Sequence, residues 1–288
     1  MSIDYFHAVV FGEKSDSHIR NFTLSFAIFG FLLHLFLWFL HSSQLLLFSE
    51  SASHLLGSPL FALYTPFSIL LGYEVYEIIK TIPASFSTAI GKQYEVATLL
   101  VVRDVFKRLT EVEFSSGWNI SGELGLVLLE CTAFLVLFYT ALKYQMSSSN
   151  LKSVEWEQNA LSKFVTGKKM IAIVLMVTFI VITILTFVGW LSMTLDGQIL
   201  ADRDIFFSDF FTCLILANIL ILLASYRLAH DFYSLVRNTG FVLSTVLMWV
   251  AITAPGASGI ILFITSALIG IVILEITRYY NSKVETNE

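Results

Sequence analysis

Long apolar segments limit the fold of this chain more than any other feature. The cleanest of them has no ionisable side chain between Met170 and Leu195, and a helix needs about 20 apolar residues to cross the hydrocarbon core of a bilayer. Charged residues make up only 14% of the 288 residues, against roughly 25% in soluble domains. This excludes a soluble enzyme, a disordered chain and a nucleic-acid-binding module. The sequence predicts an all-α, polytopic transmembrane helical bundle.

The segments predict a single integral-membrane domain over residues 1–288 with about eight spans. The predicted spans are 22–48, 58–82, 85–112, 122–144, 169–193, 206–226, 239–254 and 258–277. The last two spans come from one long apolar run, in which Pro255 and Gly256 indicate a tight turn over 254–259. The first run is too long for the apolar core of a cleaved signal peptide, so we expect it to be retained as the first span.

The segment 85–112 is the uncertain span, because charged residues flank its apolar middle. If it crosses the membrane, thirteen of the 17 Lys and Arg residues lie on the cytoplasmic side and four lie outside. If it lies at the interface, seven spans remain and the division is nine to eight. The positive-inside rule favours eight spans. We therefore expect an integral plasma (inner) membrane protein with both termini in the cytoplasm, and an interfacial third helix stays open as the alternative.

One sizeable loop, 145–168, lies between the fourth and fifth predicted spans. Its residues Leu151, Val154, Leu161 and Phe164 fall near helical spacing, and lysines flank them. An amphipathic helix of this kind lies well on an anionic membrane surface. The pattern predicts a cytoplasmic interfacial helix, with a docking surface for a partner as the open alternative.

Four ionisable residues at membrane depth are the first functional candidates, because charges are costly there. Pro83 marks the turn between the second and third helices. Counting from this turn at ~1.5 Å per residue places Glu74 and Lys92 at the same depth, ~12 Å into the membrane. Counting from the next loop places Arg103 and Glu130 together at ~13 Å. The spacing predicts two ion pairs, Glu74 with Lys92 and Arg103 with Glu130.

Further charges on these helices are secondary candidates. Glu95 and Asp104 belong to the third helix, which either lines a polar pathway or lies at the interface; both interpretations stay open. Glu77 shares a helix face with Glu74, and two carboxylates in a low dielectric repel, so that one of them would hold a proton. The alternative is that Glu77 simply pairs with Lys80 near the inner interface.

The remaining polar residues within the spans have more ordinary expected roles. His34, near the middle of the first span, is a candidate for a proton relay with Glu74. We expect Asp209 to cap the sixth span rather than to form an outer ion site, while Asn218 and Ser266 suit interhelical hydrogen bonds. The sequence shows no metal-ligand spacing and no phosphate-binding loop, so we expect no metal, no cofactor and no enzymatic activity.

These residues predict a channel or transporter for cations or protons. The expected residues of its ion pathway or coupling are Glu74, Lys92, Arg103 and Glu130. The alternative is a non-catalytic membrane subunit, scaffold or sensor of a larger complex, and an integral-membrane enzyme or electron carrier is a third hypothesis. We expect the lipid bilayer as the environment, and a second copy or another membrane subunit as the partner. No nucleic acid is expected as a partner.

Overall fold

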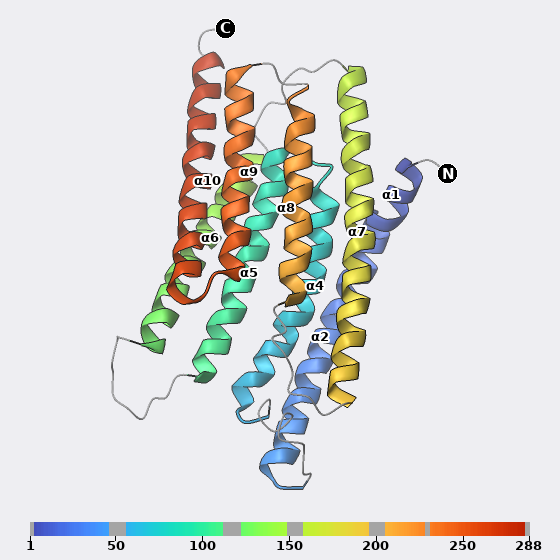
Figure 1. Cartoon of the computed structure of the whole chain (residues 1–288), viewed down its shortest axis with the longest axis vertical. Helices are drawn as coiled ribbons and strands as arrows, with labels where there is room; N and C mark the ends of the chain where they lie inside the picture. Colours follow the sequence, from blue (N-terminus) through green and yellow to red (C-terminus); the bar gives the residue numbers. More distant parts are fainter. Residues whose placement is uncertain are drawn as a thin grey trace.

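The computed structural model describes residues 3–45, 56–111, 122–148, 158–195, 205–227 and 231–285, and every regular element in these ranges is a helix. The elements are α1 (Ile3–Phe11), α2 (Glu13–Ser42), the 3-10 helix η1 (Pro59–Leu63), α4 (Tyr64–Thr81), α5 (Phe86–Glu111), α6 (Glu123–Ser148), α7 (Gln158–Leu195), α8 (Ile205–Ser225), α9 (Phe232–Thr253) and α10 (Gly256–Glu285). They run lengthwise through one bundle, with α1 and the end of α10 in the same half (Figure 1).

Five helical segments in the described ranges are long and apolar enough to cross a membrane. They are Ile3–Ser42, Leu124–Ser147, Ala160–Gly189, Phe232–Thr253 and Gly256–Lys283. The fold is therefore the predicted all-α transmembrane bundle. The crossing of the more charged α4 and α5, and with it the count of eight spans, stays a prediction.

The charged helix α5 lies at the centre of the bundle, in contact with α4, α6 and α9 (Figure 1). Its residues Tyr94, Val96 and Ala97 have no exposed surface. The apolar face that suggested an interfacial helix thus packs against protein. The structure places α5 among its neighbours rather than across an end of the bundle.

The most apolar long helix, α7, has the opposite environment. Val174, Ile184 and Leu185 are each more than half exposed, and α7 lies at the outside of the bundle, with α8 and α1 as neighbours on either side (Figure 1). Lipid tails are as apolar as these side chains, so exposure of this face carries no penalty in a bilayer. The outer helices therefore supply the lipid-facing surface and α5 supplies the polar interior.

Close helix packing holds α5 against α6 and α10. The Tyr94 hydroxyl donates to the Ser266 carbonyl oxygen at 2.8 Å, and the Tyr144 hydroxyl donates to the Gly270 carbonyl oxygen at 2.9 Å. A Cβ atom added at Gly270 would lie 2.4 Å from the Tyr94 hydroxyl, and one at Gly91 would lie 3.0 Å from Tyr144 Cβ. Glycine at Gly270 leaves room for the tyrosine, which would have to shift if a Cβ were added.

Side-chain hydrogen bonds connect the helices at two further places. Asn218 Nδ2 and Trp249 Nε1 both donate to Gln93 Oε1, at 3.3 Å and 3.1 Å, which joins α8 and α9 to α5. Ser266 Oγ donates to the Ser244 carbonyl oxygen at 2.6 Å, which joins α10 to α9. The interhelical hydrogen bonds predicted for Asn218 and Ser266 are confirmed.

Both turns predicted from Pro and Gly are present. Helix α4 ends at Thr81 and α5 begins at Phe86, on either side of Pro83. Helix α9 ends at Thr253 and α10 begins at Gly256, whose φ of 54° lies in the left-handed region that glycine adopts without strain.

Several predicted helix limits are wrong. Helix α1 was not predicted, α2 occupies Glu13–Ser42 instead of 22–48, and α9 begins seven residues before the expected 239. Residues 145–148 belong to the end of α6 and 158–168 to the start of α7; 149–157 lie outside the described residues, so the interfacial helix expected in 145–168 stays a prediction. Hydropathy marks the part of a helix that meets lipid, whereas helix propagation adds a hydrogen bond per residue and continues through charged residues.

Candidate functional site

Ionisable side chains gather at two places along α5. The first group, here named the Lys92 cluster, consists of Asp16, Glu74, Glu77, Lys80, Lys92 and Glu95. The second group, here named the Arg108 pocket, surrounds a cavity and contains Asp104, Lys107, Arg108 and Glu130. All the residues at which an ion pathway was predicted belong to, or adjoin, one of these two groups.

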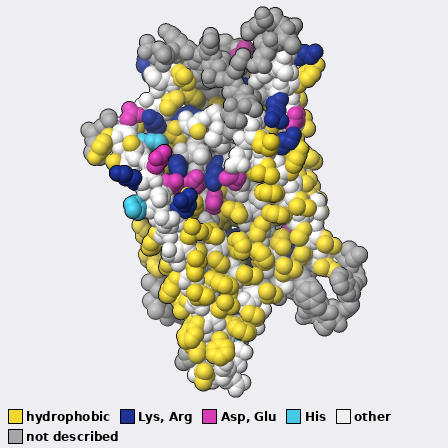
Figure 2. All heavy atoms as spheres, turned by 180° about the vertical axis from the view of Figure 1, so that it is seen from behind, with side chains coloured by type: hydrophobic (Ala, Val, Ile, Leu, Met, Phe, Trp, Pro, Cys, Tyr) yellow, Lys and Arg dark blue, Asp and Glu magenta, His cyan; other side chains and the backbone are white. Residues whose placement is uncertain are grey.

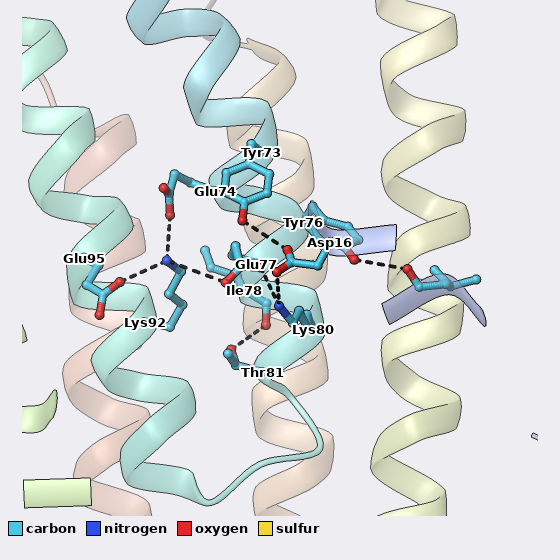
Figure 3. Close-up of polar contacts among 11 residues, drawn as sticks. Asp16, Tyr73, Glu74, Tyr76, Glu77, Ile78, Lys80, Thr81, Lys92 and Glu95 are labelled. Carbon is cyan, nitrogen blue, oxygen red and sulfur yellow. Dashed lines mark hydrogen bonds and ion pairs between the residues drawn. The ribbon is translucent and has the colours of Figure 1, made fainter. Parts of the chain in front are cut away.

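Lys92 lies at the centre of the first cluster (Figure 3). Its Nζ atom is 2.9 Å from a carboxylate oxygen of Glu74 and 2.9 Å from one of Glu95, with a Glu77 oxygen at 4.0 Å. One ammonium group thus faces three carboxylates. Glu95 follows Lys92 by three residues, so helix geometry alone brings these two side chains together. Glu74 and Glu77 reach Lys92 because α4 packs on α5.

A second lysine joins α2 to the cluster (Figure 3). Lys80 Nζ lies 3.0 Å from Glu77 and 3.0 Å from Asp16, and the Tyr73 hydroxyl donates to Asp16 at 3.1 Å. The expected pairing of Glu77 with Lys80 is present. The sequence analysis missed Asp16, because residues 43–63 separate α2 from α4 and depth cannot be counted across so long a connection.

The depth of the cluster follows from its distance to the α4–α5 turn. Lys168 Nζ donates to the Ala84 carbonyl oxygen in this turn and lies 5.3 Å from the centre of the Phe86 ring. Beyond Lys169, α7 carries no ionisable side chain, so this level marks one boundary of the apolar layer. Lys92 follows Ala84 by eight residues, which places it ~12 Å deeper.

The Lys92 cluster lies at the surface of the bundle, and not in its core. The side chains of Lys92, Glu74 and Glu77 are each 16% exposed, and that of Glu95 is 35% exposed. Figure 2 shows acidic and basic side chains gathered in a band on the rear face, above an almost wholly hydrophobic surface. With four carboxylates and two lysines, the cluster carries an excess of formal negative charge.

His34 has a different partner from the one predicted. Its Nδ1 atom lies 2.8 Å from the Thr65 hydroxyl in the first turn of α4. Glu74 lies nine residues further along that helix, ~13 Å away along its axis. The predicted relay between His34 and Glu74 is therefore not assembled in this structure, because the two residues belong to different levels of the α2–α4 contact.

The Arg108 pocket contains the second group of charges. Arg108 Nε donates to Glu130 at 2.5 Å, and the Glu130 side chain is only 6% exposed. Next to it, Arg103 pairs with Asp104 at 3.1 Å and lies over the Tyr64 ring, 5.4 Å from its centre. These contacts connect α5 to α6 and to the start of α4.

A cavity of about 220 Å³ opens between α5, α6 and the α9–α10 turn, at the end of α5 far from the Lys92 cluster (Figure 1). Asp104, Lys107 and Arg108 on α5 and Glu130 on α6 form its charged wall. The opposite wall is apolar, and four of its seven residues are Ala or Gly: Ala251, Ile252, Ala254, Gly256, Gly259, Ile260 and Phe263.

Counting residues from the turns correctly predicted one of the two ion pairs. Glu74 and Lys92 meet at 2.9 Å, but the ion pair of Glu130 described above is to Arg108. Arg108 lies three residues before the end of α5 and Glu130 seven residues after the start of α6. Counting assumed that the two helix ends are level, whereas this contact joins positions offset by about four residues, ~6 Å.

Asp209 does not cap its helix, contrary to expectation. Helix α8 begins at Ile205, so Asp209 lies inside it, with an exposed side chain. The predicted start at 206 is one residue from the observed start, so Asp209 lay too far along the helix to be its cap in either case. Within the described residues, no group of three or more His, Cys, Asp and Glu side chains is placed to hold a metal ion, and Cys131 and Cys213 are both free thiols.

Protein-family models, curated protein sequences and solved structures were compared with this chain, and none of them matches it. Its function is therefore argued from the geometry of the two clusters.

Proposed function

We propose that this protein moves protons or small cations across the membrane along α5. The observation that carries the proposal is the placement of ion-paired carboxylates toward both ends of this central helix. Glu74 pairs with Lys92 in one cluster and Glu130 pairs with Arg108 in the other. Glu95 and Asp104, the inner limits of the two groups on α5, are nine residues apart, ~13 Å.

The chemistry of the carboxylates suits such a role. A carboxylate held in a low dielectric binds a proton or a cation when its basic partner withdraws, and releases it when the ion pair re-forms. Lys92, shared by three carboxylates, and Arg108, held by Glu130, are the partners that would withdraw. Intramembrane ion pairs of this kind commonly mark ion pathways.

Transport would require a movement of α5 or its neighbours. Between the two clusters, Val96, Ala97 and Leu100 are at most 2% exposed, and this packing separates the two groups of charges. The proposal therefore assigns the structure to a closed state, in which each cluster is reached from its own end of the bundle. Homo-oligomerisation and an inner-membrane location with cytoplasmic termini are retained as parts of this proposal.

Flux through proteoliposomes tests the proposal. We expect the parent protein to pass protons, Na⁺ or K⁺ above the protein-free rate, and Glu74→Gln and Glu130→Gln each to reduce that flux strongly. Glu275→Gln is the matched control, because Glu275 is 47% exposed and pairs with Lys143 away from both clusters. Flux that is absent in the parent, or equal in all four proteins, would contradict the proposal.

A second function is favoured by the exposure of the Lys92 cluster. Charges on a lipid-facing surface are costly, and a partner helix with basic residues would pair with the excess carboxylates of the Lys92 cluster and cover the band of charged side chains in Figure 2. The protein would then be a non-catalytic subunit of a membrane complex. A stoichiometric partner that co-purifies in mild detergent and is lost in Glu95→Lys, together with no flux by the isolated chain, would support this function over transport.

A further inference from the structure

The cavity of the Arg108 pocket has two unlike walls. One wall carries Asp104, Lys107, Arg108 and Glu130, which are two acidic and two basic side chains. The facing wall is made of small and apolar residues from α9 and α10. A space shaped in this way offers charge of both signs to one side of a ligand and an apolar surface to the other.

The balance of charge excludes the simplest ligands. A bare anion would meet Glu130 and Asp104, and a bare cation would meet Lys107 and Arg108, with Arg103 beside Asp104, so each would be repelled by charges of its own sign on the wall. A molecule that carries both charges a few ångströms apart meets opposite charge at each end. The wall therefore matches a zwitterion.

Charged groups already in contact show how the ligand would be held. Arg108 and Glu130 lie 2.5 Å apart, so a ligand inserted between them would give its carboxylate to Arg108 and its ammonium group to Glu130. One ion pair is then replaced by two. Lys107 and Asp104 lie three residues apart on α5 and add a second basic and a second acidic group on the same wall.

The first turn of α10 shapes the facing wall. Gly256 and Gly259 line the cavity there, and neither carries a side chain that would reach into the space. The close packing of Gly259, where an added Cβ would lie 2.6 Å from the Ala254 carbonyl oxygen, keeps this turn compact and leaves the space beside it open.

We propose that the Arg108 pocket binds a small zwitterion, an α-amino acid with a short apolar side chain. The cavity of about 220 Å³ lies below the ~300–1,000 Å³ of drug-sized sites, which favours a compact ligand. Its carboxylate contacts Arg108 and Lys107, its ammonium group contacts Glu130 and Asp104, and its side chain contacts the apolar wall. This inference goes beyond ion movement, because binding can be measured whether or not the protein carries a flux.

Equilibrium binding of radiolabelled alanine to the purified full chain in detergent tests the inference. We expect saturable binding that unlabelled alanine and glycine displace. Acetate and methylamine, which each carry one charge, and N-acetylalanine amide, which carries none, should displace it about tenfold less well or worse, because each leaves charged groups of the wall without a partner. Absence of saturable binding, or equal displacement by acetate, would overturn the inference.

Two pairs of variants locate the site. Ala254→Leu fills the cavity from its apolar wall, and Ala257→Leu places the same side chain at an exposed position of the same turn that does not line the cavity. Lys107→Met removes one charge of the wall, and Lys163→Met removes an exposed lysine from the start of α7. We expect Ala254→Leu and Lys107→Met to lose binding by about tenfold or more, with both controls unchanged.

Melting of each variant establishes that it is folded, and equal binding by Ala254→Leu and Ala257→Leu would place the ligand elsewhere and refute the inference. The outcome is separable from that of the transport proposal. Alanine binding without ion flux refutes transport alone, and ion flux without alanine binding refutes the zwitterion site alone.

Discussion

In the Lys92 cluster the charged side chains pair with one another, whereas in the Arg108 pocket they line one side of an open cavity. The first cluster holds two lysines and four carboxylates from α2, α4 and α5 in a chain of contacts between 2.9 and 4.0 Å. The second faces a cavity of about 220 Å³ lined on its far side by the α9–α10 turn. The two groups are carried by one helix and use the same kinds of side chain.

The difference follows from what each group faces. The members of the Lys92 cluster come from α2, α4 and α5 and pair with one another, so they hold three helices together. The Arg108 pocket faces residues such as Ala254 and Gly256, which are too short to reach the charged wall. We therefore expect the first cluster to contribute more to stability and the second to contribute more to ligand binding.

The largest expected effect is that of Lys92→Met. It leaves Glu74, Glu77 and Glu95 close together without their shared cation. Removing one partner of a buried ion pair costs about 3–5 kcal/mol, and the partial exposure of these side chains puts the loss near the lower limit, about 3 kcal/mol. Thermal unfolding in detergent measures the loss, with Lys163→Met as the control.

A second variant confirms the cause of that loss. Lys92→Met combined with Glu74→Gln should recover part of the stability, because one of the repelling charges is gone. If Lys92→Met melts with the parent, the cluster does not hold the three helices together and the comparison fails.

A smaller loss is expected for Glu130→Gln. The glutamine oxygen still accepts from Arg108, and the open cavity admits water, so only the charge assistance of the hydrogen bond is lost. Hydrogen bonds to charged groups contribute about 1.5–3 kcal/mol, and we expect a decrease at the lower end of this range. Thermal unfolding of Glu130→Gln and Lys92→Met under the same conditions compares the two losses of stability. A larger loss in Glu130→Gln would show that the Arg108 pocket contributes more to stability than the Lys92 cluster.

The packed stretch between the clusters is tested by Gly270→Ala. The new Cβ would lie 2.4 Å from the Tyr94 hydroxyl, so the tyrosine must move and weaken its hydrogen bond to Ser266. Overpacking of this kind costs about 1–3 kcal/mol, and we expect about 1 kcal/mol because a tyrosine end can shift. Gly189→Ala is the control, since a Cβ there meets nothing within 4 Å. Equal melting of the two variants would show that the stretch is loosely packed.

A carboxylate outside both clusters gives the smallest expected effect. Asp231 accepts a hydrogen bond from the Ser234 N–H at 2.8 Å and so caps α9. Burial alone would raise the pKa of Asp231, but the hydrogen bonds from Ser234 outweigh it and lower that pKa. Asp231→Ala should cost about 1 kcal/mol at neutral pH, below the loss from Lys92→Met.

The pH dependence of this effect has a definite sign. Because the pKa is lowered in the folded protein, the stabilisation is present at neutral pH and is lost as the pH falls through the folded-state pKa. The difference in melting temperature between parent and Asp231→Ala should therefore narrow in acid. A difference that stays constant or widens would show that the cap does not depend on the carboxylate charge.

Much of the candidate site could be predicted where a tight turn joins two helices. Glu74 and Lys92 flank the turn at Pro83, and counting residues from that turn gave their common depth. The same method failed for Arg103 and Glu130, because the helices on either side of 112–121 are offset along their axes. It could not place Asp16 at all, because no short turn connects α2 to α4.

The sequence by itself determined the fold class, the turns at Pro83 and Gly256, and which helices carry charge. These properties depend on local composition and on the 1.5 Å rise of a helix. Only the tertiary structure decided that the charged α5 is central and the apolar α7 peripheral, and that Arg108 rather than Arg103 forms the pair with Glu130 described above. Helix offsets, rotations and neighbours arise from side-chain packing between segments far apart in the chain, and hydropathy does not record that packing.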